Sequence, residues 1–252
     1  MQDKICICYN KLMNIYWFGR HLDKDFGYVS DLLEDSGFSG WLLPYAVGVP
    51  DPFVRIARGL KTDQKLKYLV AVRPYNISPQ YLLAISQSLD LIQEDRVRIN
   101  FVPGYIKDEF EKSFGGGGIS EIDDNSSWED RKKYFCSYIE QFYNLKTKKP
   151  YTYVSGLPDD LCPQMSKFGN CNIVSYARLF EGKLNNFNKN GMIFFPVYQI
   201  NQFKERIEHV KQGGYNNIMI HTDGDKDFDL ALEVFKEVKK LKNYEYTKDC
   251  PL

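Results

Sequence analysis

An arginine stands at the end of one of the most apolar stretches of the chain. In LKYLVAVRPYNISP (66–79) a run of branched and aromatic residues ends at Arg73, and a helix start follows within five residues. A strand that is apolar on both faces is typical of a buried parallel sheet. If that sheet closes into a barrel, the carboxyl ends of its strands form the mouth where ligands bind. The pattern predicts that Arg73 lies at the rim of a site; the alternative is that it pairs with a neighbouring carboxylate.

Histidine and cysteine, which often ligate catalytic metals, are scattered along the chain. The three histidines are His21, His209 and His221, and their spacing indicates no metal site. The six cysteines include no C-x-x-C pair and are expected to be free, mostly buried thiols. In HTDGDKD (221–227) the acids permit two interpretations, a metal cluster with His221 or caps of the following helix, and capping is favoured. We therefore predict no metal, with His221 facing the same rim as Arg73.

Alternating strand and helix patterns must position these side chains. Eight short β-rich runs are separated by helical patterns, an order typical of βα units and a parallel sheet. One helix is predicted to start at a capping Ser78 with Pro79 in its first position, and another to run from a capping Asn201 to Gly213. The predicted strands are 14–18, 40–45, 67–72, 98–103, 151–156, 171–176, 192–198 and 217–222.

Eight such units in one chain indicate an α/β fold, a (β/α)₈ TIM barrel that occupies residues 1–252 as a single domain. An open, doubly wound sheet is the alternative. The segment FGGGGISEIDDNSS (114–127) breaks the rhythm and is predicted to be a mobile glycine-rich loop. The seventh predicted strand runs almost directly into the next helix, so the barrel is expected to be compact.

Charge and hydropathy argue against several classes of function. Thirty-three basic residues balance thirty-three acidic ones, so no net field favours nucleic acid or an anionic membrane. We find no apolar stretch of about 18 residues and no signal-peptide pattern. These features predict a cytoplasmic protein that binds neither nucleic acid nor membranes.

Five segments carry a family resemblance: MNIYWF (13–18), GWLLPYAVGVPDPFVRIARGL (40–60), the long run from LKYLVAV to NFVPGY (66–105), WEDRKKY (128–134) and PYTYVSGLPDD (150–160). In them the chain resembles the luciferase-like flavin-dependent monooxygenases, nearest the alkanesulfonate monooxygenase branch, in a shortened and diverged form. The third segment is the most specific. The resemblance implies a barrel that takes reduced FMN from a separate flavin reductase and oxidises a small or carrier-bound organic substrate. It also implies a homodimer or heterodimer, and a deazaflavin is an alternative to FMN.

The resemblance and the mouth geometry together supply candidate site residues. Catalytic roles are predicted for His21, which falls near a family histidine, and for Arg73 and His221. The predicted contacts of the cofactor are Tyr45, Asn100, Tyr105, Arg131, Ser155 and Gly156. The tyrosines expected near the mouth, apt for covering a flavin ring, are Tyr45, Tyr75, Tyr105, Tyr153 and Tyr198.

The chain also departs from the family pattern. The reactive cysteine of the family falls at Val49, and two of its histidines fall at Trp128 and Pro196, none of which transfers a proton. Two acids, Asp159 and Asp160, stand where the flavin phosphate is expected. These departures leave two alternatives to the enzyme: a non-catalytic flavin-binding protein or inactive heterodimer subunit, and a barrel of this ancestry that uses no flavin.

Overall fold

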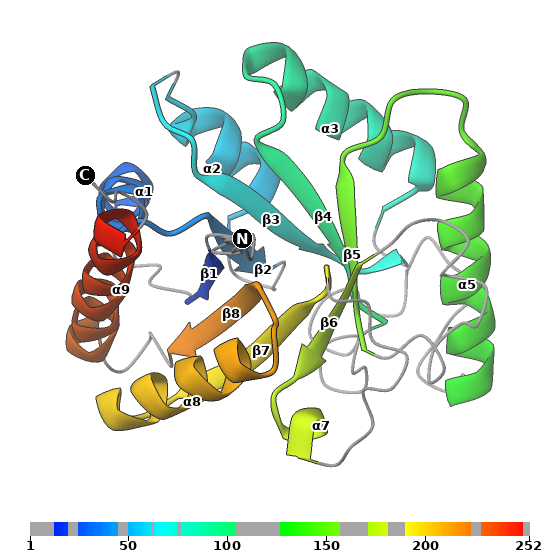
Figure 1. Cartoon of the computed structure of the whole chain (residues 1–252). Helices are drawn as coiled ribbons and strands as arrows, with labels where there is room; N and C mark the ends of the chain where they lie inside the picture. The colour runs from blue at the N-terminus through cyan, green and yellow to red at the C-terminus, as the bar shows by residue number, and fades with distance from the viewer. Residues whose placement is uncertain are drawn as a thin grey trace, which may run out of the picture.

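In a computed structural model of the chain, eight parallel strands close into a barrel in the order β1 to β8. The helices lie outside this ring of strands (Figure 1). The predicted (β/α)₈ barrel is confirmed, and the open-sheet alternative is wrong. The structure describes residues 13–19, 25–44, 50–61, 63–74, 77–103, 127–156, 171–180, 190–222 and 228–248.

Each strand begins and ends within two residues of its predicted bounds. The strands are β1 (Asn14–Phe18), β2 (Gly40–Pro44), β3 (Lys67–Val72), β4 (Val97–Phe101), β5 (Tyr151–Ser155), β6 (Cys171–Ser175), β7 (Met192–Val197) and β8 (Asn217–Thr222). The helices are α1 (Phe26–Asp35), α2 (Pro52–Gly59), α3 (Pro79–Ile92), α5 (Trp128–Asn144), α7 (Ala177–Phe180), α8 (Ile200–Gln212) and α9 (Phe228–Lys248).

Side chains alternate along each strand between the helices and the barrel interior. On β3, for example, Tyr68 and Val70 belong to the large core beneath the helices, whereas Leu69 belongs to a separate cluster. That second cluster fills the middle of the barrel. Its buried members are Tyr16, Leu42, Leu69, Tyr153, Ile173, Met192 and Met219. The barrel is therefore solid at its centre, and any site must lie at one of its two ends.

The helix starts follow local capping chemistry. Ser78 accepts a hydrogen bond from the backbone N–H of Tyr81, and Pro79 opens α3 as predicted. Asp51 caps α2 in the same way, through the N–H groups of Phe53 and Val54. These caps fix the amino ends of both helices beside the carboxyl end of β3.

The prediction for α8 is wrong at its start. The helix begins at Ile200, one residue before Asn201, and the cap position, Gln199, makes no side-chain hydrogen bond. Only two residues separate β7 from α8, so the short connection expected from the sequence is confirmed. The buried face of the helix and its end at Gly213 agree with the prediction.

Of the glycine-rich loop predicted at 114–127, only Ser127 lies among the described residues. It is the N-cap of α5 and forms a reciprocal capping box with Asp130. None of the described helices is both long and apolar enough to cross a membrane.

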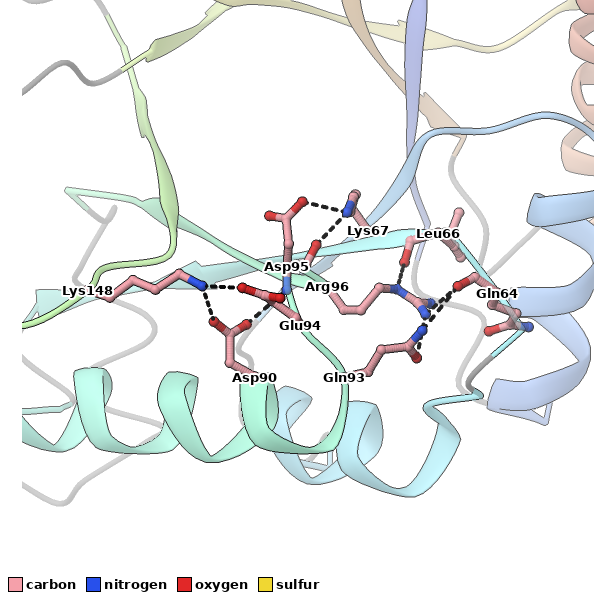
Figure 2. Close-up of polar contacts among 9 residues, drawn as sticks. All are labelled: Gln64, Leu66, Lys67, Asp90, Gln93, Glu94, Asp95, Arg96 and Lys148. Carbon is pink, nitrogen blue, oxygen red and sulfur yellow. Dashed lines mark hydrogen bonds and ion pairs between the residues drawn. The ribbon is translucent and has the colours of Figure 1, made fainter.

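A polar network ties together the loops at the amino end of the barrel (Figure 2). At its centre Arg96, only 2% exposed, donates from Nε to the carbonyl of Leu66 at 2.7 Å. Its Nη1 donates to the carbonyl of Gln64 at 2.6 Å and to Oε1 of Gln93 at 2.8 Å. These bonds join the segment before β3 to the segment before β4, and so hold the two strands in register at their amino ends.

Candidate active site at the barrel mouth

A pocket of about 440 Å³ opens at the carboxyl ends of the strands. We call it the mouth pocket. Its floor is the top of the central cluster, where Leu42, Ile173 and Met219 meet. The volume falls within the range typical of small-molecule sites, and an apolar floor with a few polar groups is the usual lining of such sites.

Three residues predicted for the site line this pocket together: Arg73, Asn100 and Ser155. Arg73 directly follows β3, and by strand alternation it shares the inward side of Ala71. Asn100 is 3% exposed, and its side chain lies 3.0 Å from the hydroxyl of Ser155 across β4 and β5. No Asp or Glu is among the described residues that line this pocket, whereas Asp51 and Arg73 together line an adjoining pocket.

His221 lies at the rim, against two aromatic rings of the pocket. Its ring stacks on that of Phe18 at 4.5 Å between centroids and 28° between planes, and it lies 6.0 Å from the ring of Phe194. Both phenylalanines line the mouth pocket. In the strand register His221 is paired with Phe18 on β1 and with Pro196 on β7. The imidazole therefore lies at the level of the pocket opening.

Gly156 makes the turn that follows β5. Its φ of +108° is a backbone conformation that residues with a side chain rarely adopt. Its N–H donates to the carbonyl of Ile173 at 2.8 Å, and its carbonyl accepts from Nδ2 of Asn172 at 2.7 Å. The turn is thus bonded to β6 on both sides, and the predicted phosphate loop that continues from it lies outside the described residues.

The remaining predicted residues either lie away from the lining of the mouth pocket or fall outside the described residues. Arg131 lies half-buried near the start of α5 and is not among the residues that line the mouth pocket. Tyr198 is 61% exposed and also lies outside that lining. The predicted positions outside the described residues are His21, Tyr45, Val49, Tyr75, Tyr105, Asp159 and Asp160, and the side chain of Trp128 is likewise not described.

The prediction that Tyr153 lies near the mouth is wrong. Tyr153 precedes Ser155 by two residues, so it faces inward one layer lower, about 6.6 Å down the strand. There it packs edge-on against Tyr16, with 6.4 Å between ring centroids, and lines a pocket at the amino end.

Sequence reasoning missed Phe18 and Phe194, the rings that flank His221. Each stands next to another aromatic residue in its strand, Trp17 and Phe195 respectively, and both of those neighbours are fully buried beneath the helices. The composition of these strands could not say which ring faces inward. Once Arg73 fixes which residues of β3 face the barrel interior, the alternation of side chains on the neighbouring strands would identify Phe18 and Phe194 as inward-facing.

No family model matches the chain. Among solved structures, the EDTA monooxygenase EmoA from Chelativorans sp. BNC1 has 11% identity over 81% of this chain and 67% of its own, with a TM-score of 0.55. The chain shares the barrel fold of a monooxygenase. DmoA from Hyphomicrobium sulfonivorans has 14% identity over 84% of this chain, with a TM-score of 0.51. The chain spans 59% of the length of DmoA. At these identities the likeness to EmoA and DmoA is a likeness of fold.

Proposed function

We propose that this protein is a luciferase-like flavin-dependent monooxygenase that binds reduced FMN in the mouth pocket and oxidises a small or carrier-bound organic substrate. The observation that carries the proposal is the convergence of Arg73, Asn100 and Ser155 on one pocket with an apolar floor. The fold shared with EmoA and the resemblance of residues 66–105 to the luciferase-like family support the same assignment.

The pocket fits the chemistry of a flavin ring. An isoalloxazine is flat and largely apolar on its faces, with hydrogen-bonding atoms along one edge. The floor and the rings of Phe18 and Phe194 suit the faces, whereas Arg73 and Asn100 suit the polar edge. When bound, the reduced flavin would supply the electrons and the activation of oxygen, and the protein would supply the pocket and the orientation.

Each polar residue of the pocket has a distinct task in this proposal. Arg73 would hold negative charge on the reduced ring or on the substrate, because a guanidinium remains charged and donates several hydrogen bonds. Asn100 would bind the ring edge from a side chain already oriented by Ser155. Ser155 would begin the contact with the flavin phosphate and Arg131 would complete it, while Gly156, bonded to β6, would hold the turn between them in shape.

His221 would take the role of proton donor and acceptor. The histidine that the resemblance places on the seventh strand falls at Pro196, which cannot transfer a proton. His221 is the register partner of Pro196 on the neighbouring strand, so it offers an imidazole at the same height of the barrel. Imidazole is the side chain best suited to proton transfer near neutral pH.

The proposal is tested by titrating the purified protein with reduced FMN under anaerobic conditions, with oxidised FMN and with a deazaflavin. Tight binding of reduced FMN, followed by oxygen-dependent turnover in the presence of a flavin reductase, would support the enzyme. Tight binding of oxidised FMN alone would indicate a flavin carrier or an inactive subunit. If none of the three ligands binds, the flavin assignment fails.

Replacement of Arg73 by alanine is expected to weaken the binding of reduced FMN, or of the substrate, at least about tenfold. This is the effect expected from the loss of one charge-assisted hydrogen bond. The affinity of Arg73→Lys should lie between those of the wild-type protein and Arg73→Ala, because lysine keeps the charge but not the fork of donors. The control is Lys239→Ala, which removes an exposed cation on α9. Unchanged affinity in Arg73→Ala, with an intact circular dichroism spectrum, would contradict the assignment.

We propose further that the protein forms a dimer through α2 and α3, which lie side by side (Figure 1). Large apolar residues are exposed on these helices: Val54 63%, Tyr81 62%, Leu91 91% and Ile92 54%. Such groups of apolar residues commonly mark protein interfaces.

The proposed monooxygenase function also includes a separate flavin reductase as partner and a cytoplasmic location.

The dimer is tested by sedimentation of Leu91→Asp. We expect the wild-type chain to sediment as a dimer at tens of micromolar and the variant as a monomer, because an aspartate at the interface would be desolvated without a partner. Tyr198→Asp, at a tyrosine after β7 that is 61% exposed, is the control and should remain dimeric. A monomeric wild-type protein at these concentrations would contradict the proposal.

A further inference from the structure

A second pocket, of about 510 Å³, lies at the opposite end of the barrel from the mouth. We call it the amino-end pocket. Three cationic side chains line it, those of Lys65, Lys67 and Arg98, and no Asp or Glu is among its described lining residues. Three asparagine amides also line it, at positions 14, 190 and 217. The packed central cluster separates it from the mouth pocket.

Arg98 is the least ordinary member of this lining. It occupies an inward position of β4, where small barrels usually carry apolar side chains. Its Nε is shielded from solvent and has no hydrogen-bond acceptor in the described part of the chain. Its guanidinium lies 4.8 Å above the ring of Tyr151. A shielded donor without an acceptor is costly, and a bound anion would satisfy it.

Two tyrosine hydroxyls lie beside Arg98, where Tyr153 donates a hydrogen bond to Tyr16 and leaves the Tyr16 O–H as a neutral donor. Burial raises the pKa of both Tyr16 and Tyr153, which keeps the phenols protonated at neutral pH. Burial would lower the pKa of Arg98, but a guanidinium is so basic that it stays protonated at neutral pH even here. The guanidinium therefore remains charged within a ring of groups that can donate hydrogen bonds.

One of the three cations already has a counterion. Lys67 Nζ contacts the Oδ2 atom of Asp95 at 2.7 Å, an ion pair at the edge of the network in Figure 2. Lys65 is exposed, and its backbone N–H donates to Oε1 of Glu34 at 2.9 Å. With Lys67 and Asp95 taken as a neutral pair, Arg98 and Lys65 leave the pocket with an excess of positive charge.

We propose that the amino-end pocket binds a small oxyanion of the phosphate type, with Arg98 and Lys65 as its charged contacts and the hydroxyl of Tyr16 as a further donor. A guanidinium with a hydroxyl donor matches the several acceptor oxygens of such a group. The anion is either free phosphate or the phosphate of an organic monoester, whose carbon portion would contact Tyr151 and Phe38.

The test is calorimetric titration of the flavin-free protein with inorganic phosphate and with phenyl phosphate, at a constant ionic strength set with chloride. We expect saturable binding with a dissociation constant below about 1 mM. Arg98→Gln should weaken it at least about tenfold, and Lys65→Ala about threefold, in line with a buried and an exposed charge respectively. Tighter binding of phenyl phosphate would identify a monoester as the ligand, and equal or weaker binding would identify free phosphate.

Two controls separate this site from the mouth. Lys146→Ala removes an exposed charge near the same end of the barrel and should leave binding unchanged, as should Arg73→Ala. Lys65→Ala keeps the test decisive if Arg98→Gln does not fold, because Lys65 is exposed. The proposal is overturned if no saturable binding is seen, if neither available variant weakens it, or if Arg73→Ala abolishes it, which would locate the anion at the mouth. Because no flavin is present, the result is independent of the proposed monooxygenase function.

Discussion

Replacement of Arg96 by alanine is expected to lower the free energy of unfolding by about 3 kcal/mol or more, since it takes a donor from several buried carbonyl groups. The guanidinium bonds the carbonyls of Leu66 and Gln64 and the side chain of Gln93, and it lies 5.6 Å above the ring of Tyr68. With alanine the carbonyl of Leu66 loses the donor Nε of Arg96, that of Gln64 keeps only a 3.4 Å bond from Nε2 of Gln93, and the packed stem leaves a cavity.

Urea unfolding followed by circular dichroism measures this loss. Arg96→Lys should recover only a part of it, because one ammonium cannot bond three acceptors arranged around a planar fork. Lys239→Ala, at an exposed lysine of α9, should change the free energy of unfolding by less than about 0.5 kcal/mol. A loss below about 1 kcal/mol in Arg96→Ala would mean that the amino-end network does not hold β3 and β4 in register.

Replacement of Ala71 by phenylalanine is expected to weaken the binding of reduced FMN by at least about a hundredfold, which corresponds to about 2.7 kcal/mol. Ala71 lines the mouth pocket, where its register partners are Pro44 on β2 and Asn100 on β4. A phenyl ring built from this position would occupy space above Leu42 and Met219 that the flavin ring requires. The barrel should remain folded, because the added ring extends into the pocket and not into the packed core.

The matched control is Ser137→Phe, which places the same ring on the exposed side of α5. Anaerobic fluorescence titration of both variants with reduced FMN provides the measurement. If Ala71→Phe binds reduced FMN as well as the wild-type protein does, the flavin does not occupy the mouth pocket.

The barrel could be predicted from the sequence because the strands differ so clearly from the helices. KYLVAV and MIFFPV are apolar on both faces, which suits strands covered by helices outside and by one another inside. Helix starts were predicted well where a cap and a proline coincide, as at Ser78. The start of α8 differs from the prediction because Asn201 is a good cap by type, whereas the observed cap position, Gln199, lies two residues earlier.

Site residues could be predicted only on strands where the sequence shows which side chains face the barrel interior. Arg73, Asn100 and Ser155 were brought to one pocket because each stands near the carboxyl end of its strand on the inward side. Tyr153 was misplaced because strand membership alone does not give the height of a side chain along the barrel. The amino-end pocket was not foreseen, since its residues lie at strand starts and in loops that are distant in the sequence.

The most direct test of the account is a crystal structure of the protein grown or soaked anaerobically with reduced FMN. We predict that the isoalloxazine ring lies on Leu42, Ile173 and Met219, with Arg73 and Asn100 within hydrogen-bonding distance of its polar edge. An isoalloxazine ring bound at any other place, or a mouth pocket still without flavin at saturating FMN, would contradict the account.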